Sequence, residues 1–145
     1  MYMLDTNICI YIIKRKTENV LGKLKQNWKK GLYISTITLA ELEFGNANAD
    51  ILYKERNRLA LLEFLTIMGI KHFDELAAKE YGMLKKNLKG RNSLGPFEPQ
   101  PSPQGEGSPL DMLIAAHAKS LNMTLVTNNA KEFERIQDLK IENWV

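Results

Sequence analysis

Three acidic residues that lie far apart along the chain are the first candidates for chemistry. Asp5 directly follows a short apolar segment, Glu41 lies in the segment Thr38-Leu39-Ala40-Glu41, and Asp111 precedes an apolar run. Carboxylate oxygens are the ligands that Mg²⁺ prefers, and one or two of them, with water and a substrate phosphate, commonly hold this ion. If folding brings the three together, their chemistry suits metal-dependent cleavage of a phosphodiester.

Each of these carboxylates also has a plain structural interpretation. Glu41 fits the last position of a capping box that starts at Thr38. Asp111 fits the N-cap of the helix that follows it, and Asp5 fits a turn residue before Ile8. The residues alone leave both interpretations open.

Other kinds of catalysis have weaker support in the sequence. Cys9 is the only cysteine, so it is expected to be a buried small hydrophobe and neither a disulfide nor a zinc site. His117 comes six residues after Asp111 and would point to another face of a helix, which favours a structural role. His72 has no evident partner. The segment Gly105-Glu106-Gly107 lacks both the strand and the Lys-Ser/Thr pair of a phosphate-binding loop.

The elements that position these residues alternate between short strands and helices. The predicted strands are residues 2–4, 32–34, 69–73 and 124–126, and the predicted helices are residues 8–13, 39–45, 59–67, 111–121 and 130–136, with one more from after Asp74 to about Lys89. This alternation predicts parallel strands with right-handed crossovers, hence an α/β sheet covered by helices. Ligands bind beyond the carboxyl ends of such strands. Asp5, Asn128 and Asn129 follow strands and should lie on that edge.

Length and composition predict one globular domain, residues 1–145. The chain has 44% hydrophobic residues, which is ample apolar surface to bury against the entropy of ordering the backbone. No apolar run approaches the ~18 residues that span a bilayer, and the N-terminal segment lacks the features of a signal peptide. We therefore expect a cytoplasmic protein without membrane contact. A net charge of +3 permits a polyanionic partner without requiring one.

One segment breaks the alternation of strands and helices. All five prolines lie between Pro96 and Pro109, and this composition forms neither a helix nor an interior strand. We expect an exposed, mobile loop inserted at about residues 95–109. An insertion without a specific role is favoured over a Pro-rich ligand for a partner domain.

Four segments occur in one order along the chain. They are Met3-Leu4-Asp5-Thr6-Asn7-Ile8, Thr38-Leu39-Ala40-Glu41-Leu42-Glu43-Phe44-Gly45, Pro109-Leu110-Asp111-Met112-Leu113-Ile114-Ala115-Ala116-His117-Ala118 and Leu125-Val126-Thr127-Asn128-Asn129-Ala130-Lys131-Glu132-Phe133. This order resembles the PIN-domain family and, within it, the VapC toxins of bacterial toxin–antitoxin pairs. The resemblance covers nearly the whole chain, and only the Pro-rich insertion departs strongly from it.

The resemblance implies both a fold and a function. The implied fold is a small α/β/α sandwich with a central, mostly parallel sheet of about five strands covered by helices. The implied function is that of a Mg²⁺-dependent endoribonuclease toxin, with Mn²⁺ as a possible substitute, which cleaves structured RNA such as tRNA. The implied assembly is a homodimer held silent by a VapB-like antitoxin, with DNA contacted only through that antitoxin.

The resemblance also assigns catalytic positions. Asp5, Glu41 and Asp111 match the first three acidic positions of the family. Asn129 matches the fourth, which is often an aspartate. In this interpretation Asp5 and Asp111 bind the metal directly, and Glu41 holds the metal-activated water that attacks the phosphodiester.

Further residues are predicted to support the site or to bind RNA. Thr6 and Asn7 orient the first carboxylate, and Glu132 supplies the charge that Asn129 lacks. Thr127 is a further supporting residue. The residues expected to contact RNA phosphates are Lys14, Arg15, Lys85, Lys86 and Arg91.

The main alternative is a catalytically impaired PIN-like scaffold that only binds its antitoxin and contributes to promoter autoregulation. Two features favour it: Asn129 replaces an acid, and a long insertion directly precedes Asp111. A generic α/β phosphohydrolase is weaker, because Asp5-Thr6-Asn7 lacks the second aspartate of an aspartyl-phosphate enzyme. The separation of Asp111 from Asp5 and Glu41 in the fold distinguishes a metal site from the scaffold.

Overall fold

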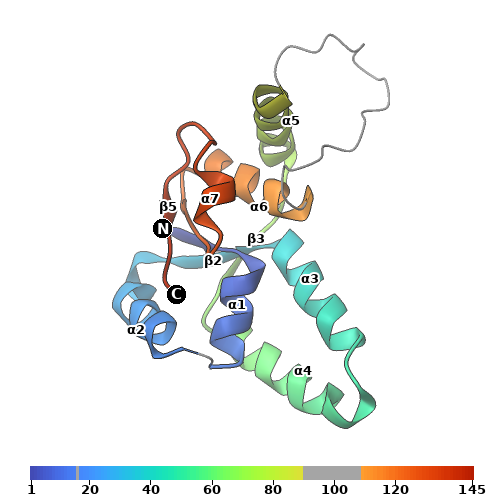
Figure 1. Ribbon diagram of the computed structural model, residues 1–145. Helices are drawn as coiled ribbons and strands as arrows, with labels where there is room; N and C mark the ends of the chain where they lie inside the picture. The colour runs from blue at the N-terminus through green and yellow to red at the C-terminus, as the bar shows by residue number, and fades with distance from the viewer. Residues whose placement is uncertain (16, 90–108) are drawn as a thin grey trace.

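Five short strands form the centre of the computed structural model (Figure 1), which describes residues 1–15, 17–89 and 109–145. They are β1 (Tyr2–Leu4), β2 (Leu32–Ser35), β3 (Gly69–Lys71), β4 (Thr124–Val126) and β5 (Ile141–Glu142). Their order across the sheet is β3-β2-β1-β4-β5, and every neighbouring pair is parallel. The carboxyl ends of the strands therefore lie along one edge.

Helices flank both faces of this sheet. They are α1 (Thr6–Ile13), α2 (Glu18–Asn27), the 3₁₀ turn η1 (Trp28–Lys30), α3 (Thr36–Ala47), α4 (Ile51–Leu65), α5 (Glu75–Lys89), α6 (Pro109–Ser120) and α7 (Ala130–Phe133). The fold is the α/β/α sandwich expected from the sequence. Within the described residues, no helix combines the length and apolarity needed to cross a membrane.

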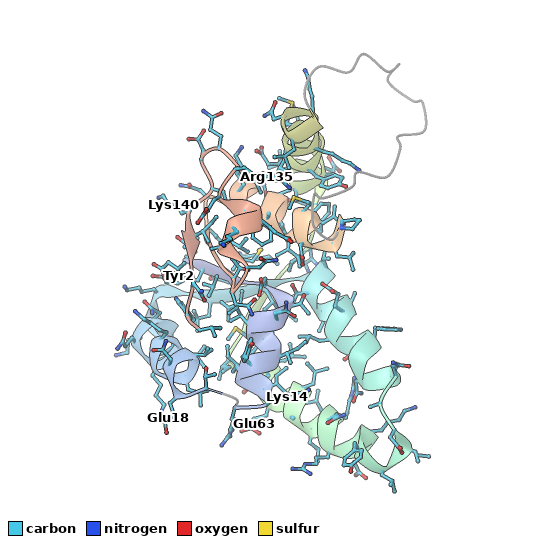
Figure 2. All side chains as sticks on the ribbon, viewed as in Figure 1. Tyr2, Lys14, Glu18, Glu63, Arg135 and Lys140 are labelled. Atoms are coloured by element: carbon cyan, nitrogen blue, oxygen red, sulfur yellow. The ribbon has the colours of Figure 1, made fainter. Side chains whose placement is uncertain are left out.

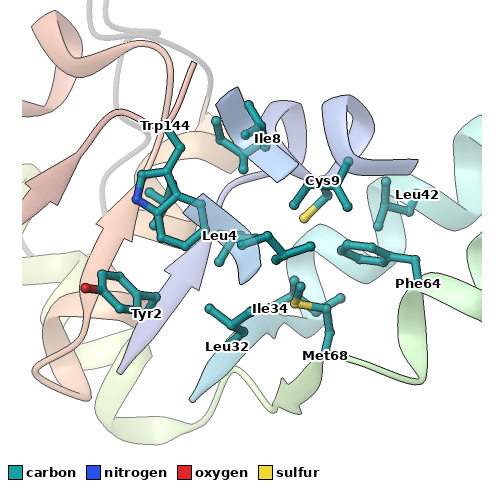
Figure 3. Packing of buried hydrophobic residues seen from close by; sticks show 14 of the residues in the cluster. Tyr2, Leu4, Ile8, Cys9, Leu32, Ile34, Leu42, Phe64, Met68 and Trp144 are labelled. Atoms are coloured by element: carbon teal, nitrogen blue, oxygen red, sulfur yellow. The ribbon is translucent and has the colours of Figure 1, made fainter. Parts of the chain in front are cut away.

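Alternate side chains of the strands enter two separate cores. Leu4, Ile34 and Val126 pack with α1, α2 and α4 on one face (Figure 3). Met3 and Leu125 pack with α6 and α7 on the other face. Because β1, β2 and β4 are covered on both faces, they are short apolar runs and can be predicted from the sequence.

Several elements differ from the sequence prediction in their ends. The helix expected from residue 59 begins at Ile51, because the side chain of Asp50 accepts a hydrogen bond from the Leu52 N–H at 3.1 Å and caps it. The strand expected to reach residue 73 stops at Lys71, since the Phe73 N–H donates instead to a side chain of α3. The helix expected over residues 130–136 ends at Phe133.

Three elements were not located from the sequence: α2, the 3₁₀ turn η1 and β5. The lysines of α2 were interpreted only as a charged cluster, although Val20 and Leu24 of this helix are buried. Strand β5 is two residues long and has no apolar run. The predicted Pro-rich loop at about residues 95–109 lies almost entirely outside the described residues; only Pro109 is described, as the first residue of α6.

Candidate active site

The carboxyl edge of the sheet brings two polar turns together. Asp5 follows β1 and Thr127 follows β4, and these neighbouring strands pair with Leu4 opposite Val126. The Asp5 N–H donates to the Val126 carbonyl at 3.0 Å. The turns after the first and fourth strands in sequence therefore lie side by side, as the strand order requires.

Asp5 is held from several directions. It is 4% exposed, and its Oδ1 accepts the Ile8 N–H at 3.0 Å, which caps α1. The Thr127 hydroxyl and the Asn7 backbone N–H also bond to this carboxylate. Burial raises the pKa of Asp5 and the Glu41 charge raises it further, while the hydrogen bonds act in the opposite sense. Asp5 is thus a helix cap and a member of an acidic cluster at once.

Glu41 projects from α3 toward the start of α1. Its Oε1 accepts the hydroxyl of Thr6, the residue after Asp5, at 2.7 Å. The N-cap of α3 is Ser35, whose Oγ accepts a backbone N–H of the first turn at 3.1 Å. The capping-box interpretation of Thr38 and Glu41 is therefore wrong, since the side chain of Glu41 bonds across to another helix.

Asp111 is the third residue of α6, so it lies within the first turn and not at the N-cap. Burial, together with the charges of Asp5, Glu41 and Glu132, raises the pKa of Asp111 to about 6. Mutual effects of this kind require that the carboxylates lie near one another. We call Asp5, Glu41, Asp111 and Glu132 the acidic edge. The insertion before α6 leaves Asp111 within electrostatic reach of the other three.

The fourth motif position involves two adjacent asparagines. Asn129 is exposed and its side chain makes no capping hydrogen bond, although its N–H donates to Thr127 Oγ1 at 3.0 Å. Asn128 has a buried Oδ1 with no hydrogen-bond partner in the described part of the chain. The sequence placed both asparagines on this edge but gave a role only to Asn129. Their position after a strand was the signal that pointed to Asn128.

The donor atoms of the acidic edge suit a hard cation. Carboxylate and amide oxygens gather there, which are ligands typical of Mg²⁺ or Mn²⁺. Within the described residues, no three Asp, Glu, His or Cys side chains are arranged to hold one ion between them. A site of one or two carboxylates completed by water is the usual form for Mg²⁺. Asp5 and Asp111 fit that form, and the unpaired oxygen of Asn128 is a further neutral donor.

Two of the basic residues expected to contact RNA share a groove with Glu41. The groove, of about 610 Å³, lies between α1, α3 and α4 and is lined by Lys14, Arg15 and Arg56 as well as Glu41. Figure 2 places Lys14 at the end of α1 that points away from the sheet. Arg15 also forms an exposed ion pair with Glu63 at 3.6 Å.

Of the other three candidates for RNA binding, two lie on α5 and one is outside the described residues. Lys85 and Lys86 belong to α5, and Lys86 is exposed, while the Lys85 Nζ lies 5.6 Å from the centre of the Tyr81 ring. Arg91 lies outside the described residues. Only Lys14 and Arg15 are therefore placed in one groove with a residue of the acidic edge.

Known proteins resemble this chain over almost its whole length. The PIN domain family matches residues 2–139. Ribonuclease VapC2 of Haemophilus influenzae is 40% identical over 144 residues, which cover 99% of this chain and 98% of that protein. The tRNA(fMet)-specific endonuclease VapC of Shigella flexneri is 36% identical over 145 residues, 99% of this chain and 97% of its own.

Solved structures agree with the sequence relatives. One is the crystal structure of VapBC2 from Rickettsia felis bound to a DNA fragment from the promoter. Its matching chain has a TM-score of 0.83 and is 36% identical, and the match covers 99% of this chain and 98% of that chain. DNA-bound VapBC of Salmonella typhimurium gives a TM-score of 0.80 at 35% identity, with coverage of 99% and 98%. The chain therefore belongs to the PIN-domain family, among its VapC members.

Proposed function

We propose that this chain is a Mg²⁺-dependent endoribonuclease toxin that cleaves structured RNA such as tRNA and is controlled by a VapB-like antitoxin. The names of its relatives, a ribonuclease and a tRNA-specific endonuclease, support the reaction class. The solved VapBC complexes support the antitoxin. The observation that carries the proposal is the acidic edge, where carboxylates from distant segments meet.

In the proposed reaction, water attacks a phosphodiester of the RNA, the bond from phosphorus to one ribose oxygen breaks, and that oxygen leaves with a proton. Mg²⁺, when bound, lowers the pKa of a water molecule and offsets the charge on the phosphate. Asp5 and Asp111 hold the ion, and Glu41 orients the attacking water. The Thr6 hydroxyl fixes Glu41 at 2.7 Å, and the Thr127 hydroxyl bonds to Asp5. Both carboxylates are thereby oriented before substrate arrives, which removes part of the entropic barrier.

Glu132 and the asparagines complete the proposed site. Asn129 is neutral where the family often has an aspartate, and Glu132 lies close enough to Asp111 to raise its pKa. We therefore assign to Glu132 the negative charge that Asn129 lacks. Because the side chain at position 129 is itself neutral, a second metal site beside it should be weaker than the first.

Cleavage of purified tRNA tests the proposal. The purified protein is expected to cleave tRNA with Mg²⁺ or Mn²⁺, to stop with a chelator, and to lose activity in Asp111→Asn. Cleavage that continues with the chelator would overturn the metal dependence. A protein that binds its antitoxin but never cleaves RNA would support the scaffold alternative.

The proposed antitoxin site lies on α3 and α4. These helices expose large apolar side chains, which we call the apolar arm: Phe44, Ile51, Leu52, Tyr53, Leu59 and Leu62. Exposed apolar surface of this extent commonly marks an interaction site. The adjoining groove has apolar walls and contains Glu41. A bound antitoxin segment would therefore reach the acidic edge, and DNA would be contacted only through the antitoxin.

A homodimer is also part of the proposal. Leu76 and Met83 of α5 are 67% and 50% exposed and stand two helical turns apart on one face. We propose that this face pairs with a second copy in the cytoplasm. Light scattering is expected to give twice the chain mass, and Met83→Glu is expected to give the monomer mass; a monomeric wild-type protein would contradict the pairing.

A further inference from the structure

A buried polar contact joins the two helices that carry Glu41 and Asp111. His117 of α6 is 1% exposed, and its Nδ1 lies 2.8 Å from the Oγ of Ser35. Ser35 is the last residue of β2 and the N-cap of α3. A side chain of α6 thus contacts the point where α3 begins.

The contacts around His117 favour one tautomer. Burial lowers the pKa of His117 most strongly, while the charge of Asp74 and a hydrogen bond with the backbone of His72 act in the opposite sense. Because burial favours the neutral ring and Nδ1 faces Ser35, we assign the ring proton to Nε2, which leaves that nitrogen to donate to the backbone of His72. Nδ1 then accepts the Ser35 hydroxyl, and the Ser35 Oγ accepts the Ile37 N–H at 3.1 Å. Every group in this series has a partner.

Phe73 holds the imidazole from another side. Its ring lies edge to face with His117, with centroids 5.4 Å apart and an interplanar angle of 76°. The Phe73 N–H donates to Thr36 Oγ1 at 3.1 Å, which attaches this segment to the first turn of α3 as well. The contact is therefore a rigid junction between α3, α6 and the segment after β3.

Glu41 and Asp111 lie at the same distance from this junction, each along its own helix. Glu41 lies six residues after Ser35, and Asp111 lies six residues before His117. At 1.5 Å per residue, the backbone of each acid is about 9 Å from the junction along its helix. A rotation of about 10° between the helices would move either backbone by about 1.5 Å, and a displacement of about 1 Å can lower a rate by about 100-fold.

Asp111 depends on this junction more than the other two acids do. Asp5 and Glu41 are tied to their neighbours by hydrogen bonds of their own. Within the described residues, the carboxylate of Asp111 has no hydrogen bond, so its place is set by the placement of α6. We propose that His117, through its bond to Ser35, is a positioning residue that holds Asp111 in register with Glu41. This inference rests on the proposed ribonuclease function of the acidic edge.

Two substitutions of His117 separate positioning from packing. His117→Asn keeps an acceptor near the place of Nδ1, facing Ser35, and loses the donor to His72. His117→Gln keeps a donor near the place of Nε2 and loses the acceptor for Ser35. Each variant removes one buried hydrogen bond, so both are expected to lose similar free energy of unfolding in urea with a chelator.

Mn²⁺ binding and tRNA cleavage are then measured on the full chain. His117→Gln is expected to weaken Mn²⁺ binding, followed by electron paramagnetic resonance, by about tenfold or more, and to lower kcat with little change in KM. His117→Asn is expected to stay within about threefold of wild type for both, and Ser35→Thr, which keeps the hydroxyl, should do the same. Equal losses in the two His117 variants would overturn the proposal.

A metal-free readout keeps this inference separate from the proposed function. Hydrogen exchange of the backbone amides at residues 113–116 is expected to be faster in His117→Gln than in His117→Asn. If the wild-type protein cleaves no RNA, the ribonuclease proposal fails, and the exchange rates still decide whether Ser35 fixes α6. Identical exchange in the two variants would overturn the positioning role.

Discussion

The acidic edge and the apolar arm both include residues of α3, yet they are built in different ways. At the acidic edge, Asp5 is almost fully buried, and hydrogen bonds from Thr6 and Thr127 hold the carboxylates. In the apolar arm, Ile51 and Leu52 are 83% and 81% exposed. The chain therefore buries a charged side chain at the acidic edge and exposes apolar side chains to water in the apolar arm. The first surface is the proposed catalytic site, and the second is the surface that we propose the antitoxin covers.

Each region also contains an aspartate whose side chain caps a helix, but the two aspartates have different surroundings. Asp5 caps α1 through the Ile8 N–H at 3.0 Å, and Asp50 caps α4 through the Leu52 N–H at 3.1 Å. The carboxylate of Asp5 also interacts with that of Glu41, as part of the acidic edge. The pair offers a matched test of whether charge or capping matters at each place.

The largest effect is expected from Asp5→Asn, with Asp50→Asn as its control. Asparagine caps a helix about as well as aspartate, so neither variant should unfold. Cleavage of tRNA is expected to fall at least about 100-fold in Asp5→Asn, since even substitutions behind a metal ligand cost about 10–100-fold. Asp50→Asn should cleave at the wild-type rate. Full activity in Asp5→Asn would remove that residue from the proposed site.

The apolar arm should respond in the opposite way. Leu52→Glu or Phe44→Glu puts a charge on a surface proposed to be covered by the antitoxin, and is expected to weaken antitoxin binding about 30-fold or more, the size of a strong hot spot. RNA cleavage by the free protein should not change. Trp28→Glu, at a 62% exposed apolar position on η1 outside both proposed interfaces, is the control for the added charge. Titration calorimetry measures the affinities, and unchanged binding in both arm variants would place the antitoxin elsewhere.

The fold could be predicted from the sequence where burial leaves a pattern. Strands β1, β2 and β4 are covered on both faces, so each is a short apolar run. Strand β5 could not be predicted, because two residues that are not buried give no apolar run in the sequence. It is identified only by its pairing in the sheet, Leu125 with Ile141 and Val126 with Glu142. Helix ends were missed where one side chain decides them, as Asp50 does for α4.

The candidate site, too, could be predicted from the sequence only in part. The family motif selected Asp5, Glu41 and Asp111, and the fold places them within electrostatic reach of one another. A motif names residues but does not say which atoms they contact. The bond between Ser35 and His117 joins residues 82 positions apart, and nothing in the local pattern of either residue indicates the other. Such partners depend on how the helices pack.

A smaller effect at the acidic edge should appear as a pH dependence without metal. The pKa of Asp111 is raised from 3.8 to about 6 by burial and by its acidic neighbours. A raised pKa means that the folded protein binds the proton more tightly than the unfolded chain does, so this contribution to stability is lost as pH rises from about 4 to about 6. With a chelator present, wild type should therefore lose stability relative to Asp111→Asn over that range.

Urea unfolding of the two proteins between pH 4 and pH 7 measures this difference. Saturating Mg²⁺ should reduce the loss, because the cation offsets the repulsion among the carboxylates. A constant difference between wild type and Asp111→Asn across the range would mean that the acids do not interact as their placement requires. Asp50→Asn, which removes an exposed carboxylate at the N-cap of α4, is the reference substitution.

The smallest effects compare one side-chain bond from each region. Thr6→Val removes the hydroxyl that donates to Glu41 at 2.7 Å in a partly buried place, and a hydrogen bond to a charged group contributes about 1.5–3 kcal/mol. Arg58→Ala removes the contacts at 2.8 and 3.0 Å to Glu43 that join α4 to α3, but both partners are well exposed, where such pairs contribute about 0.2–1 kcal/mol.

Urea unfolding at pH 7 should therefore show the larger loss of stability for Thr6→Val. Cleavage should fall with it because Glu41 loses its orientation, whereas Arg58→Ala should cleave normally. Similar losses of stability in the two variants, with normal cleavage in both, would mean that the acidic edge is no more firmly built than the arm.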